Sequence, residues 1–368
     1  MKLTLLTRTA TAAALLGAVA LPASARADAA ADLLNGYNVI VFGDLTSYSQ
    51  HVDGNALVGG NVDGGTYAMH YPGIPTGTAL TVGGNLLGNV IVQGPGLTVG
   101  GNLSTGNLNY NSGGDVHVGG NVTSLFDLNG VGNLYISGNQ TGGSNVTLAN
   151  GSAYIGGAKL GTINANGGGS VHTGSSVPAA TMPDVAGQVA AAQATLSSYS
   201  SQLAALAADS SVSQDGNKLT FTATAGADGI AVFNVAGSLL SAMNEFAFSL
   251  GDATAVVINV TGEIIDIAAN FLNGSALDLA SNTLWNFTEA TDLDIERQWG
   301  GSILAVYADL DTGNNVEGSV VAAALSQRGE IHYNGPGTFV ATTPIPAALP
   351  LFGAALAIFA GRRLRRRA

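Results

Sequence analysis

Short apolar segments recur along the first half of the chain, each followed by glycines and a polar residue. A Val or Ile opens eight such segments between residues 41 and 174, at intervals of 16 to 24 residues. The segments read Val-Gly-Gly-Asn or a variant of it, and they begin at Val41, Val58, Val82, Val99, Val118, Ile136, Ile155 and Val171. A repeat of about 18 residues is too short for a propeller blade or a pair of helices, but it suits one coil of a β-solenoid. The pattern therefore predicts a mainly β fold, a right-handed parallel β-helix.

The repeated phrase has a structural interpretation. The Val or Ile is expected to enter a thin core, and the two glycines to adopt positive φ in a turn. The asparagine hydrogen-bonds readily to nearby backbone, and stacked coils would align its copies into a ladder. The ladder positions are Asn61, Asn85, Asn102, Asn121 and Asn139.

Two functional interpretations of the repeat are disfavoured. A calcium-binding nonapeptide array needs Gly-Gly-x-Gly-x-Asp, and no Asp recurs here at that spacing. A flat threonine array for ice binding fails because only Thr81 and Thr98 match across coils. The repeat therefore predicts architecture rather than a site.

One long interval holds an insertion, Thr66–Gly77. It is expected to protrude as a loop on one side of the column. His70 and Tyr71 lie within it beside Tyr67 and Met69. Aromatic rings in such a loop can stack on sugars, so His70 and Tyr71 are candidate ligand-binding residues. The alternative is a loop whose rings only cover its own backbone.

A helix is predicted over residues 182–209. Its apolar residues recur at alternating steps of four and three, the pattern of a single buried stripe. Such a helix is about 40 Å long, and eight coils rise by about 38 Å. We therefore expect it to lie along the flank of the eight coils. A coiled-coil partner helix is the alternative.

The remainder, Val212–Val340, again contains strand-like segments such as "AVVINVTG" and "SILAVYADL". The helix would return the chain to the first coil, and these segments would add wider coils beneath it. The first coil would then lie in the middle of the stack. Its edge would be covered, which matters because an open strand edge invites aggregation.

Both ends of the chain have the pattern of targeting segments. Residues 1–27 combine a basic start, an apolar run and Ala25-Arg26-Ala27, which predicts a signal peptide cleaved after Ala27 or Ala25. Residues 343–368 hold an apolar stretch from Ile345 to Gly361 and then five arginines. That stretch is close to the minimum length for a membrane helix, and the arginines would stay on the cytoplasmic side. The domain proper is therefore expected over 28–342.

The body between these ends is strongly acidic. It retains four basic residues against all 24 acidic residues, a formal net charge of −20. Such a surface repels nucleic acid and anionic lipid and attracts cations. The chain has no cysteine, so burial and backbone hydrogen bonds must stabilise it without disulfides.

Candidate chemistry is sparse. Asp292, Asp294 and Glu296 alternate along a predicted strand and would face one side, where carboxylates could bind Ca²⁺. A solvated strand face is the alternative. The five histidines show no metal-ligand spacing. No catalytic residues and no cofactor are predicted, with Ca²⁺ as the one candidate ion.

Several motifs in order resemble the choice-of-anchor A family of exported bacterial proteins. They are "YNVIVFGDL", the "VGGN" repeats, "VVINVTG", "LWNFTEAT", "GSILA" and "GSVVAAAL…GEIHYNG", and they cover nearly all of Tyr37–Phe339. The resemblance implies a β-helical adhesive domain with a variable C-terminal anchor.

The tail resembles the PEP-CTERM and VPLPA-CTERM sorting signals. The motif residues are Pro344, Ile345, Pro346 and Ala347. This resemblance implies transient membrane insertion, cleavage by an exosortase-type enzyme, and release to the cell surface or the exopolysaccharide matrix.

These observations favour a non-enzymatic surface or matrix protein that acts by many weak contacts with a glycan or a matrix protein. A carbohydrate-active β-helix enzyme is one alternative. A Ca²⁺- or glycan-binding module is another.

Overall fold

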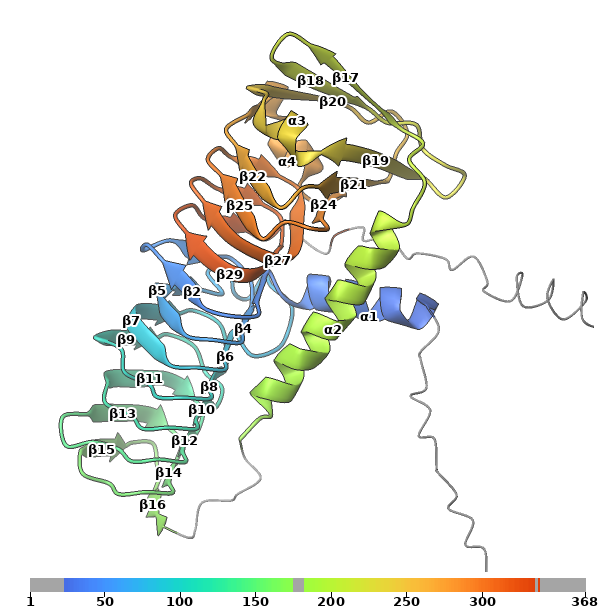
Figure 1. Ribbon diagram of the computed structural model, residues 1–368. Coiled ribbons are helices and arrows are strands. Elements are labelled where there is room, and N and C mark those ends of the chain that lie inside the picture. Colours follow the sequence, from blue (N-terminus) through green and yellow to red (C-terminus); the bar gives the residue numbers. More distant parts are fainter. Residues whose placement is uncertain (1–22, 175–181, 335–336, 338–368) are drawn as a thin grey trace, which may run out of the picture.

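The computed structural model describes residues 23–174, 182–334 and 337. Their main body is a 26-stranded sheet wound into a parallel β-helix (Figure 1). The predicted fold class is therefore confirmed. The predicted sorting motif, the membrane stretch and most of the signal peptide lie outside the described residues. None of the described helices is long and apolar enough to cross a membrane.

The repeat valines and isoleucines lie on one column of short strands. Consecutive coils pair in register, so that Val58 lies beside Val82, Val82 beside Val99, and Val99 beside Val118. The Gly-Gly-Asn copies of consecutive coils therefore stack directly over one another. The strands of this first column are β1 (Val39–Val41), β4 (Ala56–Val58), β6 (Leu80–Val82), β8 (Leu97–Val99), β10 (Val116–Val118), β12 (Leu134–Ile136), β14 (Ala153–Ile155) and β16 (Val171–Thr173).

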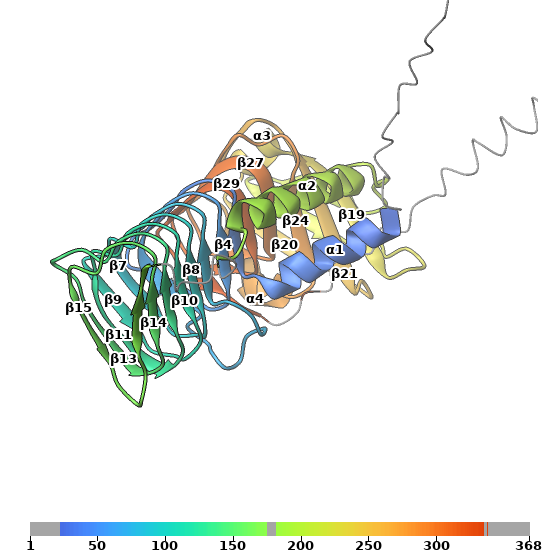
Figure 2. The same ribbon diagram turned by 90° about the horizontal axis from the view of Figure 1, so that it is seen from below.

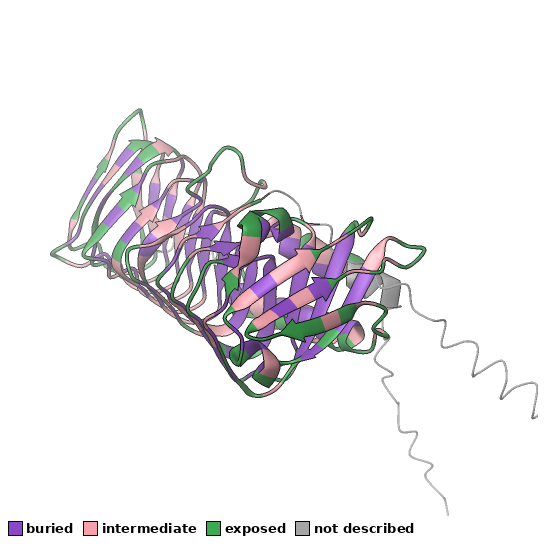
Figure 3. Cartoon of the chain, turned by 90° about the horizontal axis from the view of Figure 1, so that it is seen from above, coloured by how far each residue is buried: buried purple, intermediate pink, exposed green. Residues whose placement is uncertain are grey.

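A second column of strands follows the Gly-Gly-Asn turns. Its residues alternate between the core and the surface, as in β9 with Leu108 and Tyr110 buried and Asn107 and Asn109 exposed. Figure 3 shows this alternation of buried and exposed residues along the strands. The strands are β2 (Leu45–Ser47), β5 (Val62–Tyr67), β7 (Leu86–Val92), β9 (Asn107–Tyr110), β11 (Leu125–Val131), β13 (Asn145–Asn150) and β15 (Thr162–Ala165).

The first coil lies in the middle of the stack, as expected. Strand β1 pairs with β4 on one side and with β29 on the other, and β3 (His51–Val52) pairs with both β5 and β30. The strands of the C-terminal coils are β19 (Ile230–Ala236), β21 (Ala255–Thr261), β22 (Ile264–Ile267), β24 (Thr283–Phe287), β25 (Asp292–Ile295), β26 (Trp299–Gly300), β27 (Ser302–Thr312), β28 (Val316–Glu317), β29 (Val320–Gln327) and β30 (Ile331–His332).

A four-stranded sheet covers the far end of the C-terminal coils (Figure 1). Strand β17 (Ser211–Asp215) is antiparallel to β18 (Lys218–Thr222), which continues to β20 (Glu245–Ser249) and β23 (Asn270–Phe271). Phe221, Phe246 and Trp285 meet edge to face or tilted beneath this sheet. The wider C-terminal coils are thus filled by aromatic rings. The short helices α3 (Gly237–Ser241), η2 (Leu272–Gly274) and α4 (Ser275–Leu279) connect these strands.

The predicted helix is present but shorter than expected. Helix α2 spans Val185–Ala204, and the carboxylate of its N-cap Asp184 accepts a hydrogen bond from Gly187 N. Twenty residues correspond to about 30 Å. The missing length falls at both ends of the predicted 182–209 range.

The helix packs along the flank of the column with its apolar stripe buried, as expected, but it covers the C-terminal coils and the first two coils rather than all eight. Helix α2 contacts β21, β24 and β27, and it buries Leu304, Val321, Ile40 and Leu57 in one cluster. These residues face outward in register on the first column, which continues from Leu57 to Thr81. The outward residue is therefore apolar from Leu304 to Leu57 and polar on either side, with Asn286 before Leu304 and Thr81 after Leu57. The helix covers the apolar part and the asparagines before it, but not the polar residues after Leu57.

A second helix, α1 (Ala23–Gly36), lies beside α2 and buries Ala30 and Leu34 in the same cluster (Figures 1 and 2). The sequence analysis did not predict it, because residues up to Ala27 read as the end of a signal peptide. Both helices lie on the first column and on the C-terminal coils.

The expected positive φ of the repeated glycine pairs is also wrong. Gly83, Gly84, Gly100 and Gly101 are absent from the described glycines with positive φ. A Cβ at Gly100 would instead overlap the carbonyl oxygen of Gly83 in the preceding coil, and a Cβ at Gly101 would lie 2.7 Å from Asn85 Oδ1. The pair is glycine because adjacent coils approach too closely for a side chain.

Candidate functional site

The repeated asparagines form a continuous ladder within the turns. Asn61 Oδ1 accepts hydrogen bonds from the backbone N and the Nδ2 of Asn85, at 2.8 and 3.0 Å. Asn85 Oδ1 accepts the same two bonds from Asn102. The series starts at Asp44 and continues through Asn121 and Asn139 to the backbone N of Ala158. Their polar atoms are used to hold successive coils together.

The outward side chains of β5, β7, β9, β11, β13 and β15 form a second regular array, here called the polar face. Two in-register columns run across these strands. One holds Thr66, Ile91, Asn109, Asp127, Thr147 and Asn164, and the other holds Asn89, Asn107, Leu125, Asn145 and Thr162. Most of these side chains are exposed. Neighbouring members lie about 4.8 Å apart between coils and about 6.6 Å apart along a strand.

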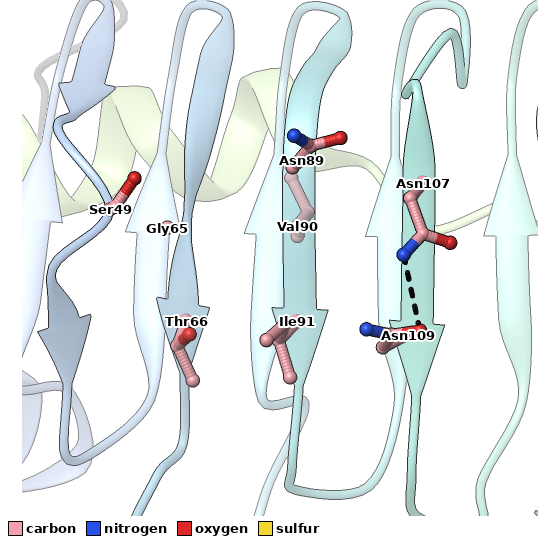
Figure 4. A pocket seen from close by; sticks show the side chains of 8 residues that line it. All are labelled: Ser49, Gly65, Thr66, Asn89, Val90, Ile91, Asn107 and Asn109. Carbon is pink, nitrogen blue, oxygen red and sulfur yellow. Dashed lines mark hydrogen bonds between the residues drawn. The ribbon is translucent and has the colours of Figure 1, made fainter.

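A shallow groove of about 350 Å³ lies on this face (Figure 4). It is lined by Ser49, Gly65, Thr66, Asn89, Val90, Ile91, Asn107 and Asn109. Asn107 Nδ2 donates to Asn109 Oδ1 at 3.4 Å within it. The groove presents amide and hydroxyl groups on a nearly flat sheet, and such groups can hydrogen-bond to the hydroxyls of a sugar chain.

Stacked rings occupy the first column beyond helix α2. His117, Tyr135, Tyr154 and His172 lie in register with ring centroids 4.8, 5.1 and 4.8 Å apart. Their ring faces contact one another, so the interior faces of the stack are closed to a ligand. Burial lowers the pKa of His117, against the opposing effect of Asp115. Thr81 and Thr98 continue this column but are buried.

The predicted acidic site extends across neighbouring coils. Asp292 and Asp294 lie on the outward side of β25, as predicted, and Asp294 also lies in register with Asp266 and Asp311 on adjacent strands. Burial, followed by the charges of Asp311 and Asp266, raises the pKa of Asp294. Asp292 is exposed on the same strand, and Glu296 lies beyond its end. Binding of Ca²⁺ by Asp292, Asp294 and Glu296 stays a prediction.

One basic residue ends this acidic column. Arg328 Nε donates to both carboxylate oxygens of Asp311, at 3.1 and 3.2 Å. Its guanidinium also lies 4.3 Å from the ring centroid of Tyr48. A shallow pocket beside this bond is lined mainly by carboxylates, those of Asp44, Asp292, Asp294, Asp309 and Asp311, together with Thr46 and Ser326.

Histidines and carboxylates gather where the first coil meets the last, a grouping here called the junction cluster. His51 and Asp53 lie at β3, and Glu317, Glu330 and His332 lie at β28 and β30. His332 Nδ1 lies 3.0 Å from Glu317 Oε2, and His332 Nε2 lies 3.1 Å from Glu330 Oε2. The hydrogen bond to Glu317 raises the pKa of His332 to about 9.

The insertion adds His70 to the junction cluster. Its Nδ1 lies 3.2 Å from Asp53 Oδ2, although the side chain is mostly exposed. Tyr71 is exposed and lies outside the cluster. Ligand binding by His70 and Tyr71 stays a prediction.

The junction cluster was not predicted from the sequence, because the five histidines show no metal-ligand spacing along the chain. The available signal was the alternation in His51-Val-Asp53 and Glu330-Ile-His332, which places both members of each pair on one side of a strand. Combined with the expected mid-stack first coil, it could have brought the two segments together.

The fold and the polar face define a class of protein, a β-helix that offers an extended regular surface. A family model described as "Putative Ice-binding-like adhesive domain" matches residues 30–127 and 92–333. The chain therefore belongs to this family of ice-binding-like adhesive domains. The family points to a non-enzymatic protein.

The remaining comparisons add little. No curated protein matches the chain. Among solved structures, the chain is similar to the crystal structure of an ice binding protein from an Antarctic bacterium, Flavobacteriaceae. The identity is 13%, the match covers 83% of this chain and 82% of that chain, and the TM-score is 0.24. A likeness this distant does not bear on function.

Proposed function

We propose that this protein is an exported adhesin that binds an extended polar ligand along its polar face. The observation that carries the proposal is the pair of in-register columns, mainly Asn, Thr and Asp, on β5, β7, β9, β11, β13 and β15. A rigid lattice of donors and acceptors suits a ligand that is itself repetitive. Each contact is weak, but many made together give useful avidity.

The ligand class follows from charge and chemistry. Amide and hydroxyl side chains complement sugar hydroxyls. A body with net charge −20 disfavours polyanions. We therefore expect a neutral polysaccharide or a neutral matrix glycan.

The proposed location depends on both ends of the chain. The predicted signal peptide 1–27 and the sorting tail 343–368, with the choice-of-anchor A resemblance, support export, processing by an exosortase-type enzyme, and a place at the cell surface or in the exopolysaccharide matrix. The adhesive family supports the same setting.

The test is binding of protein expressed from the full-length gene to a panel of neutral and acidic glycans and matrix proteins, with and without Ca²⁺. An Asn107→Lys, Asn145→Lys double variant places two long cations on the polar face and is expected to lose at least 10-fold in affinity. A control carries the same charge away from this face, Ala158→Lys with Ala194→Lys on the exposed side of α2, and is expected to bind like the unmodified protein. Equal binding by both variants would reject the polar face as the adhesive surface.

A carbohydrate-active enzyme is a second candidate, favoured by one observation. Asp294, Asp311 and Arg328 lie on consecutive coils beside a shallow pocket, and paired carboxylates are the groups that glycoside hydrolysis needs. Turnover of acidic and neutral polysaccharides, abolished by Asp311→Asn, would establish this activity. Absence of turnover over the whole panel would leave the adhesive function.

A further inference from the structure

The junction cluster contains a carboxylate oxygen that its hydrogen bonds do not explain. Asp53 is fully buried, and its Oδ1 accepts no hydrogen bond. This oxygen lies 3.2 Å from His51 Nε2, but the geometry is not that of a hydrogen bond. Asp53 Oδ2, in contrast, accepts a bond from Tyr333 N at 3.0 Å. A buried oxygen without a donor is costly unless a cation satisfies it.

Three ligand atoms converge at this point. One atom each from His51, Asp53 and His332 lie within 4.8 Å of one another. The separation of His51 Nε2 and Asp53 Oδ1, 3.2 Å, matches the edge of about 3.3 Å expected for tetrahedral ligands at zinc distances. We propose that His51, Asp53 and His332 bind one divalent transition-metal ion of the zinc type, with water completing the site.

The surrounding groups are those that orient metal-binding histidines. His51 Nδ1 lies 3.3 Å from Glu330 Oε1, which leaves Nε2 free to face Asp53. His332 Nδ1 pairs with Glu317. Glu317 is buried, and Gln298 Nε2 donates to its other oxygen at 2.8 Å. A carboxylate behind each histidine fixes the ring and strengthens the metal bond.

The donor set selects the ion. Two imidazoles and one carboxylate suit Zn²⁺ and its neighbours, whereas Ca²⁺ and Mg²⁺ prefer oxygen ligands alone. The ion would take the place of a proton at His332, since a histidine ligand must be neutral. This site is therefore distinct from the calcium candidates at Asp292, Asp294 and Glu296.

The site would fasten the two halves of the column. His51 and Asp53 belong to the first coil, and His332 belongs to the last described strand, about 280 residues later in the chain. His70 contacts Asp53 from the insertion. A bound ion would thus tie the first coil, the last coil and the insertion together, whether or not the polar face binds a glycan.

The test uses untagged protein from the full-length gene, stripped of metal with a chelator and titrated with ZnCl₂ against a chromophoric competitor. One equivalent of Zn²⁺ is expected to bind and to raise the Tm. His51→Gln and Asp53→Asn are expected to abolish stoichiometric binding, and Glu317→Gln to weaken it about 10- to 100-fold. His172→Gln, a histidine outside the cluster, is the control and is expected to bind like the unmodified protein.

X-ray absorption of the zinc-loaded unmodified protein gives a second measurement that needs no variant. Two imidazoles and oxygen ligands are expected around the ion. The proposal is overturned if the unmodified protein takes up no zinc, or if the His51→Gln variant binds zinc as tightly as the unmodified protein. It is also overturned if the absorption spectrum shows no imidazole ligands.

Discussion

The short distance between adjacent coils restricts which residues can occupy certain positions in this protein. The glycine pairs show this most directly, because a single methyl group has no room between one rung and the next. A structural role for these glycines is predictable from the repeat, but its cause is the space between coils and not a positive φ. A turn can be recognised from the residues that form it. The close approach of two coils cannot, because it involves residues that are distant in the sequence.

Replacing Gly100 by Ala tests this constraint. The new Cβ would overlap the Gly83 carbonyl oxygen, so we expect a loss of at least about 2 kcal/mol in the free energy of unfolding. The measurement is urea denaturation followed by circular dichroism. Gly143→Ala is the control, because a Cβ there meets no atom within 4 Å. Equal losses at both positions would show that the coil spacing is not limiting.

The stacked ring of His117 makes stability depend on pH. Burial lowers the pKa of His117 below its ordinary 6.5, so the folded protein resists protonation more than the unfolded chain does. The contribution of neutral His117 to the free energy of unfolding is therefore fully present above pH 6.5, and it is lost as the pH falls towards the lowered pKa of the folded state. Thermal melts between pH 6.5 and 5, where the stabilisation from the raised pKa of His332 is already largely present, are expected to show this decline.

His117→Tyr separates this effect from other titrations. A tyrosine keeps the ring stack with Tyr135 but does not titrate in this range. We expect a smaller fall in Tm on acidification than in the unmodified protein. An identical fall would mean that His117 does not contribute.

At the scale of secondary-structure elements, the helix α2 is held to the coils by a buried polar seam as well as by its apolar stripe. Ser200 Oγ donates to Asn286 Oδ1 at 2.6 Å, and Asn286 Nδ2 donates to Ser200 O at 2.9 Å and to Asn259 Oδ1 at 2.8 Å. Asn259 Nδ2 continues the seam to Leu203 O at 2.8 Å. The seam fixes the helix along its axis, which apolar contacts alone do not.

Asn286→Ala is expected to lower the free energy of unfolding by about 3 kcal/mol, because it leaves several buried hydrogen-bonding groups without a partner. Ser201→Ala on the exposed side of the same helix is the control and should change stability by less than about 0.5 kcal/mol. Calorimetry and limited proteolysis of α2 are the measurements. Resistance of α2 to proteolysis in the Asn286 variant would argue against the seam.

Sequence periodicity predicted this helix but not where it would lie. The stripe at steps of four and three shows that one side of α2 is buried. The helix position depends on Ile40, Leu57, Leu304 and Val321, which come together only when the coils stack. The junction cluster escaped prediction for the same reason, because its halves lie at opposite ends of the chain.

At the scale of the whole molecule, uneven charge leaves part of the surface under repulsion. Burial, followed by the charges of Asp311 and Asp266, raises the pKa of Asp294, so ionising this carboxyl costs more in the folded protein than in the unfolded chain. That cost is present above the raised pKa and disappears as the pH falls below about 3.8, the ordinary value.

Asp294→Asn is therefore expected to raise the Tm at pH 7 and low ionic strength, with the gain fading on acidification or in high salt. Asp215→Asn is the control, because Asp215 lies opposite Lys218 in register and its loss removes an attraction. A lower Tm for Asp294→Asn at pH 7 would indicate that the carboxylate is needed, as it would be if a cation binds there.

The coil count, the stacking and the mid-stack first coil were all predictable, since each follows from the period of the repeat and from the strand-like segments after the helix. Strand β1 consequently gains its two neighbours at very different times. While a ribosome is still translating the chain, β4 and later coils can stack below β1, but β29 emerges only about 280 residues later. A nascent chain thus carries an unpaired strand edge through most of its synthesis, and a neighbouring chain on the same messenger could pair with it. The last step of folding closes the column at its middle, not at a tip.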